Sequence, residues 1–144
     1  MNMISVVIVG FIVLEATNVI ALYFFPGSQY ANSVGVFKAW EGSKQEPEIH
    51  DFVKYLVNWV AGTKLIFLAL LIVILFTADD QGLLFTGAAL AISISSFFWR
   101  LFPLIRKMDR NNQIEPKNYS AILGLMISAF VLVFLAALLF SGAS

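Results

Sequence analysis

Residues Tyr119–Phe140 read YSAILGLMISAFVLVFLAALLF and contain no Asp, Glu, Lys, Arg or His. The hydrocarbon core of a bilayer is ~30 Å thick, and about 20 apolar residues in an α-helix cross it. A run of this length and composition predicts a transmembrane helix. A strand of a membrane barrel would instead alternate in polarity over roughly ten residues.

Three further apolar runs resemble this one, so the spans cover about residues 3–25, 55–76, 83–105 and 119–140. Lipid offers the backbone no hydrogen-bond partners, so each run must form a helix. The first run has no preceding Lys or Arg and no small-residue cleavage site after it, and we interpret it as a retained span. The sequence therefore predicts an all-α integral membrane protein, a single four-span domain over residues 1–144 folded as an antiparallel bundle.

Composition excludes several other classes of protein. Of the 144 residues 60% are hydrophobic and 12% are charged, whereas soluble domains carry about 25% charged residues. The net charge is zero and cysteine is absent, so we expect no nucleic-acid partner, disulfide or thiolate metal site. The sequence shows no nucleophile with a neighbouring base, phosphate-binding glycine loop or metal-ligand spacing. We therefore expect neither enzymatic activity nor a cofactor.

The basic residues predict how the chain is oriented in the membrane. Seven of the nine lie in the two longer connections: Lys38, Lys44, Lys54, Arg106, Lys107, Arg110 and Lys117. The short link between the second and third spans carries only Asp79 and Asp80. By the positive-inside rule, loops 26–54 and 106–118 face the cytoplasm and both termini face outward, across the cell (inner) membrane of the host.

The connection 27–54 is too long for a simple turn between helices. Its apolar residues at helical spacing are Tyr30, Val34, Phe37 and Trp40. They predict a short amphipathic helix lying in the membrane interface between the first two spans. Pro47 followed by Glu48 suits a helix start, so the second helix is expected to begin at Pro47 and extend into the cytoplasm. Two interpretations stay open for this region: an interfacial anchor, or a docking surface for another protein.

Small residues predict where the helices pack. Those at four-residue spacing are Gly87, Ala91 and Ser95 in the third span and Ser120, Gly124 and Ser128 in the fourth. Membrane helices associate through such residues because they allow close approach. We expect the third and fourth spans to pack closely, with the serine hydroxyls bonded to carbonyls of their own helix.

Three charged residues lie within the spans: Glu15, Lys64 and Arg100. A charged residue at a helix centre costs roughly 2.5 to 3.5 kcal/mol on insertion scales, so each position needs an explanation. Arg100 is close to the end of its span, where a long side chain reaches the interface. Glu15 lies mid-span with a short side chain and cannot do so.

Depth counting suggests a partner for Glu15. It precedes the end of the first span by about as many residues as Lys64 follows the start of the second, which brings the two to one level in antiparallel neighbours. We expect either an ion pair, with Asn18 and Asn58 adding hydrogen bonds, or an unpaired Glu15 that stays protonated. An interhelical contact that only fixes register is the structural alternative.

These polar residues form the candidate substrate- or ion-binding cluster: Glu15, Asn18, Asn58, Lys64 and Arg100. The sequence favours a small ion- or proton-linked transport or permeation protein. Four helices enclose little volume, so we expect a homo-oligomer or a membrane-protein partner, in addition to the lipid bilayer. The alternative is a non-catalytic accessory or scaffold subunit of a membrane complex.

Overall fold

The computed structural model of the chain describes residues 2–141. Its elements are α1 (Met3–Phe24), the 3₁₀ turn η1 (Val34–Val36), α2 (Lys38–Ser43), α3 (Pro47–Thr77), α4 (Asp80–Ser95), α5 (Phe97–Arg110) and α6 (Tyr119–Ser141). Within these residues there is no strand, and Phe37 and Ile114 form an isolated antiparallel bridge. The predicted all-α class is confirmed.

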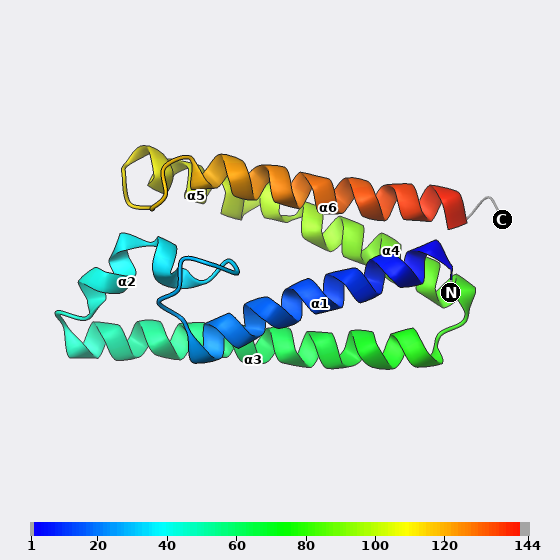
Figure 1. Cartoon of the computed structure of the whole chain (residues 1–144), viewed down its shortest axis with the longest axis horizontal. Helices are drawn as coiled ribbons and strands as arrows, with labels where there is room; N and C mark the ends of the chain where they lie inside the picture. The colour runs from blue at the N-terminus through cyan, green and yellow to red at the C-terminus, as the bar shows by residue number, and fades with distance from the viewer. Residues whose placement is uncertain (1, 142–144) are drawn as a thin grey trace.

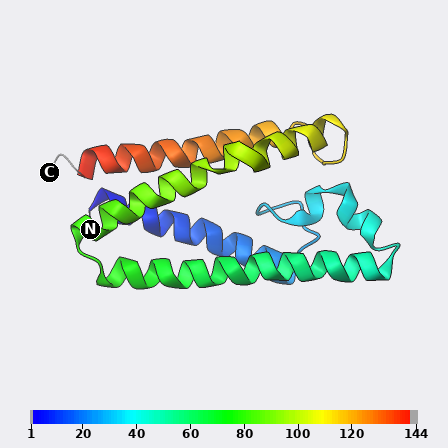
Figure 2. The same cartoon turned by 180° about the vertical axis from the view of Figure 1, so that it is seen from behind.

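The long helices form two groups that meet at one end of the molecule and separate toward the other (Figure 1 and Figure 2). α1 lies along α3, and α4 and α5 lie along α6. Near its start α1 also contacts α4 and α6, where Ile4, Ile8 and Phe134 belong to a buried apolar cluster. At the opposite end η1 and α2 lie between the two groups. The two groups of helices therefore diverge from the start of α1 toward the end where η1 and α2 lie (Figure 1).

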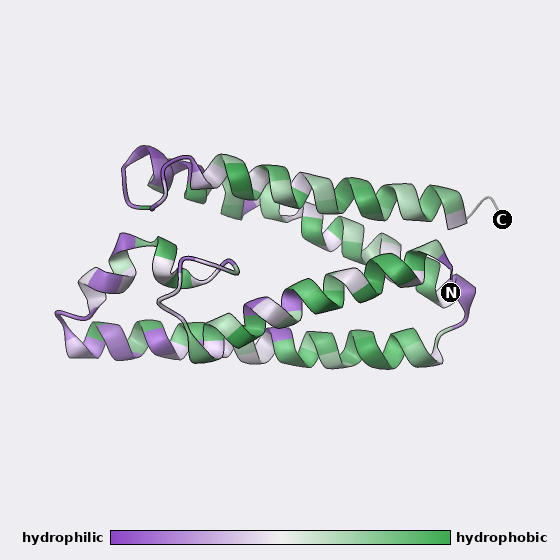
Figure 3. Ribbon diagram, viewed as in Figure 1, coloured by the Kyte–Doolittle hydropathy of each residue, from purple (hydrophilic) through white to green (hydrophobic). Residues whose placement is uncertain are grey.

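Within residues 2–141, four helical segments are long and apolar enough to cross a membrane: α1, α3, α4 together with α5, and α6. Figure 3 shows hydrophobic residues along most of their length, with hydrophilic residues in the loops and the first turns of α3. Large side chains such as Ile92 and Leu125 are 74% exposed. Soluble proteins rarely expose apolar surface so extensively. These helices indicate a multi-pass membrane protein.

The third apolar segment is not one helix. The structure breaks the predicted span 83–105 at Ser96, between α4 and α5. The Ser95 hydroxyl donates to the carbonyl four residues back, and the Ser96 hydroxyl to the carbonyl three residues back. Serines bonded in this way bend helices, and Pro103 removes a further helical hydrogen bond from α5. The predicted third span is therefore present as the helical segment Asp80–Arg110, with an interruption at Ser96.

The predicted short helix over Tyr30–Trp40 is found only in part. Only η1 and the first residues of α2 are helical there, and Tyr30 is 83% exposed whereas Val36 is 1% exposed. Val36 packs against α5, the 111–118 loop and α6. The backbone turns inward at Gly35, where a Cβ would overlap the Gly27 carbonyl. Val36 and Trp40 of this segment are therefore buried against protein, whereas Tyr30 stays exposed.

The first residue of α3 is Pro47, which confirms the predicted start of the second helix. The helix continues for 31 residues to Thr77. Residues 47–54 thus belong to α3, as an extension that precedes the predicted span 55–76. Ile49 and Phe52 in this extension are 48% and 58% exposed.

The two basic connections lie together at one end of the molecule. The Lys38 backbone N–H donates to the Gln113 carbonyl (3.0 Å), and the Glu115 N–H donates to the Val36 carbonyl (2.8 Å). Lys38 Nζ also lies 3.1 Å from Glu115 Oε1. At the other end, the Asn2 side chain donates to Asp80 in the acidic turn (2.7 Å). Basic and acidic loops are therefore at opposite ends of the helices (Figure 1).

The glycines of the third and fourth spans pack against large side chains and not against each other. α4 contacts α6, but Gly87 lies against Ile4 and Leu138, and Gly124 lies against Phe102 of α5. As expected, two serine hydroxyls donate to carbonyls of their own helix: Ser95 to Ala91 and Ser128 to Gly124. The Ser120 hydroxyl donates instead to the Asp109 carboxylate. The glycines thus admit bulky side chains from neighbouring helices.

Candidate functional site

An ion pair joins the two charged residues found deepest in the spans. Lys64 Nζ of α3 lies 2.7 Å from Glu15 Oε2 of α1, and the side chains are 30% and 28% exposed. One turn of helix separates Glu15 from Asn18, whose Oδ1 accepts a second hydrogen bond from Lys64 Nζ (2.7 Å). A lysine ammonium has three donors, and two of them are used here. The arrangement is the ion-paired alternative of the two that the sequence left open.

Asn18 extends this contact to the loop that follows α1. Its side chain is 6% exposed, and its amide nitrogen donates to the carbonyls of Ala31 and Asn32, the latter at 3.0 Å. One side chain therefore accepts from Lys64 and donates to the loop, satisfying both ends of the amide. Because a buried amide left without partners would be destabilising, the Lys64 contact and the loop position support each other.

The loop is held in an uncommon backbone conformation. Ala31 and Asn32 have φ of 54° and 53°, in the left-handed region that non-glycine residues other than Asn rarely adopt. The Asn32 side-chain oxygen accepts from the Tyr119 hydroxyl at 2.6 Å, at the start of α6. Continuous hydrogen bonding thus links α1, α3, this loop and α6. Strained backbone of this kind persists only where surrounding contacts hold it.

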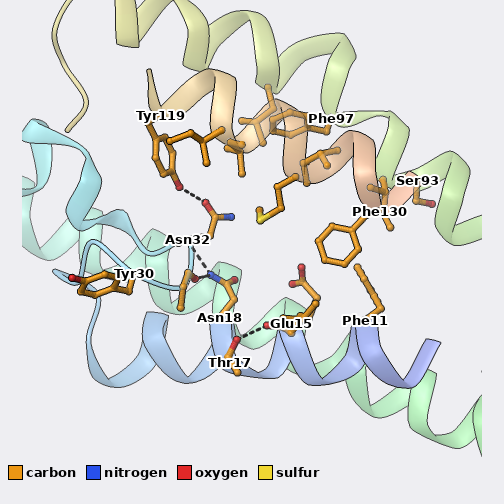
Figure 4. A pocket seen from close by; sticks show the side chains of 18 of the residues that line it. Phe11, Glu15, Thr17, Asn18, Tyr30, Asn32, Ser93, Phe97, Tyr119 and Phe130 are labelled. Carbon is orange, nitrogen blue, oxygen red and sulfur yellow. Dashed lines mark hydrogen bonds between the residues drawn. The ribbon is translucent and has the colours of Figure 1, made fainter. Parts of the chain in front are cut away.

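The network borders a cavity of about 650 Å³. Figure 4 shows Glu15, Asn18 and Asn32 directed into the space between α1 and α6, with Phe11 and Phe130 further along it. The α4–α5 break forms another wall through Ser93, Ser96 and Phe97, and Arg100 also lines the cavity. The size is within the range of pockets that bind small molecules. Charged and polar groups of the spans therefore line a partly open cavity.

Asn58 and Arg100, the other two predicted members of the cluster, take no part in the Glu15–Lys64 contact. Asn58 is exposed on α3 and does not border the cavity, and no hydrogen bond joins it to Glu15 or Lys64 in residues 2–141. The expected contribution of Asn58 to the ion pair is wrong, because Asn58 lies a turn and a half before Lys64 on a different face of the helix. Arg100 is exposed, and its guanidinium lies 5.7 Å from the centre of the Trp99 ring.

Sequence reasoning missed Asn32 and Tyr119. Both lie outside the middle of a span, where a polar residue needs no explanation, so no local signal distinguished them. Their role depends on a contact between residues 87 positions apart in the chain.

The remaining candidate groups are possible metal ligands and the histidine. No three His, Asp or Glu side chains of residues 2–141 approach closely enough to hold a metal ion. His50 Nδ1 lies 2.9 Å from the Ser43 hydroxyl, and its ring lies beside Trp40. His50 therefore joins the ends of α2 and α3.

Comparisons with protein-family models, with curated proteins and with solved structures give no match to this chain. Its function must be inferred from its own residues.

Proposed function

We propose that this chain is a small non-enzymatic membrane protein that carries out proton- or cation-linked transport or permeation through the cavity beside Glu15. In this proposal its four spans cross the cell membrane as an antiparallel bundle, with the basic loops in the cytoplasm and both termini outside. The observation that supports it best is the position of the Glu15–Lys64 pair. Glu15 lines a cavity of about 650 Å³, and Lys64 holds its carboxylate from α3 at 2.7 Å.

The network provides a means of coupling. A proton or cation that reaches Glu15 competes with Lys64 for the carboxylate, because each neutralises the same negative charge. Lys64 would then be held by Asn18 alone, and Asn18 also holds the loop at Ala31 and Asn32. Occupation of Glu15 is thereby communicated to the loop bordering the cavity. A complete pathway is expected to need a homo-oligomer, since the cavity of one chain does not reach both ends of its helices.

The test is Glu15→Gln in purified protein reconstituted into liposomes. Gln keeps the shape of Glu15 but cannot exchange a proton or hold a cation by charge. Proton- or cation-driven flux, measured with an internal pH indicator or ion-selective dye, should fall at least tenfold. Glu48→Gln is the matched control, because Glu48 is an exposed carboxylate at the start of α3, and its flux should equal that of the parent. Parent-like flux in a folded Glu15→Gln protein would refute the proposal.

A second candidate function is an accessory subunit of a membrane complex. The extension of α3 before the apolar part of the span favours it, since Ile49 and Phe52 are about half exposed where the helix carries its charged residues. Changing both to Gln should leave folding and flux intact but reduce the mass of a native complex extracted from the membrane to that of this chain's own oligomer. An unchanged mass would exclude that surface as the docking site.

A further inference from the structure

The cavity beside the ion pair has one long apolar wall and a polar end. Phe11, Met126 and Phe130 lie along it, whereas Asn32 and Tyr119 close one end. Figure 4 shows the Asn32 amide nitrogen turned toward the cavity while its oxygen is bonded to Tyr119. A molecule that fills this space would need an apolar body and a polar head at the Asn32 end.

The charge of the wall is positive. Three ionisable side chains with full charges contribute to it or adjoin it: Glu15, Lys64 and Arg100. Glu15 and Lys64 neutralise each other. No carboxylate of residues 2–141 lies within ion-pair distance of Arg100, whose contact is with the Trp99 ring. Arg100 follows Phe97 by one turn of α5, and both residues line the cavity together with Tyr119. The polar end therefore offers an unpaired guanidinium, which binds carboxylates through paired hydrogen bonds.

The volume limits the size of the occupant. Water occupies about 30 Å³ per molecule in the liquid, and a methylene group is similar in size, so about 650 Å³ accommodates about 20 non-hydrogen atoms. A long-chain fatty acid meets this limit. A phospholipid with two acyl chains exceeds it, and a small hydrophilic anion would leave the apolar wall without a partner.

We propose that the cavity binds a single-chain anionic amphiphile of the long-chain fatty-acid class. Its carboxylate lies at Arg100 and Asn32, and its chain lies along Phe11, Met126 and Phe130. This inference deepens the proposed function by naming the molecule carried. The inference concerns equilibrium binding, so it is tested separately from flux. Binding without flux would support the inference and refute transport. Flux without binding would support transport and refute the inference.

Native tryptophans allow a direct measurement in lipid nanodiscs. The Trp99 ring lies 5.7 Å from the Arg100 guanidinium, whereas Trp59 lies on α3, and neither tryptophan lines the cavity itself. Two proteins are needed, one retaining Trp99 and the other Trp59, with the remaining tryptophans changed to Phe. A brominated hexadecanoic acid should quench Trp99 with a saturable curve and Trp59 only by weak, linear partitioning into the bilayer. Unlabelled hexadecanoate should reverse the quenching of Trp99, and hexadecanol should do so at least tenfold less effectively.

Three variants locate the site, all made in the protein that retains Trp99. Arg100→Gln should weaken hexadecanoate binding about tenfold, whereas Arg106→Gln should leave it unchanged, because Arg106 is a basic residue of the same helix that does not line the cavity. Met126→Trp is read by displacement of a fluorescent fatty acid and should abolish binding by filling the apolar wall. The proposal is overturned if quenching is equal at Trp99 and Trp59, if hexadecanol competes as well as hexadecanoate, or if Arg100→Gln and Arg106→Gln behave alike.

Discussion

Removing the Glu15–Lys64 ion pair should destabilise the fold in a way that a double-mutant cycle can isolate. Two unit charges 2.7 Å apart attract by about 6 kcal/mol at an effective dielectric constant of about 20. Desolvation of both groups offsets much of this attraction. We expect Glu15→Gln and Lys64→Gln each to lower the free energy of unfolding by about 3 kcal/mol, since each leaves a poorly hydrated charge without its partner. The double variant should lose about 4 kcal/mol, which gives a coupling energy of about 2 kcal/mol.

The assay is equilibrium unfolding in mixed micelles of mild detergent and dodecyl sulfate, followed by far-ultraviolet circular dichroism. Glu41 and Lys44 provide the control pair. Their charged atoms are 2.8 Å apart, nearly the same distance, but their side chains are 65% and 49% exposed. The same cycle there should give a coupling energy of about 0.5 kcal/mol or less. A Glu15–Lys64 coupling no larger than that of the control pair would show that this partly buried contact does not stabilise the protein, and would remove the basis for the network described above.

Three further predictions use the same unfolding titration. Trp40 Nε1 is buried without a hydrogen-bond partner. Trp40→Phe should therefore change the free energy of unfolding by less than about 1 kcal/mol, whereas Trp40→Ala should lower it by about 3 kcal/mol or more. A large loss in both variants would mean that the indole N–H is satisfied. Gly35→Ala should lose about 2 kcal/mol because its Cβ would overlap the Gly27 backbone, while Gly42→Ala, which meets open space in α2, should lose nothing; equal effects would contradict the inward turn of the loop. Asp109→Ala should lose about 1 to 2 kcal/mol, because its carboxylate accepts hydrogen bonds from the Asn118 N–H, the Ser120 N–H and the Ser120 hydroxyl at the start of α6; an unchanged midpoint would show that this capping contributes nothing.

Much of the candidate site could be predicted from the sequence. Glu15 and Lys64 carry a cost that can be recognised without a structure, since a charge inside an apolar span needs a partner. Counting residues from the span ends placed them at one depth because the rise of a helix is constant. Asn18 followed from sharing a face with Glu15. The predicted contact of Asn58 with the ion pair was wrong, since depth alone does not specify which face of α3 is turned toward α1.

The remaining parts of the site depend on contacts between distant segments. Asn32 and Tyr119 are ordinary polar residues near span ends, and only the packing of the 27–33 loop against α6 brings them together. The loop itself was predicted to lie in a membrane interface because its apolar residues have helical spacing. In the structure Val36 is instead buried against side chains of α5 and α6. Local periodicity identifies an apolar face but does not specify what covers it.

By itself, the sequence determined that the chain has four apolar helices, that α3 begins at Pro47, and that Glu15 and Lys64 need partners. These properties follow from hydrophobicity, proline geometry and the cost of charge in lipid, which act locally. Only the tertiary structure decided that the loop after α1 folds inward and that Glu15 of the ion pair lines a cavity. Those outcomes depend on how side chains from α1, the loop and α6 fill space together, and nearest neighbours in the chain do not contain that information.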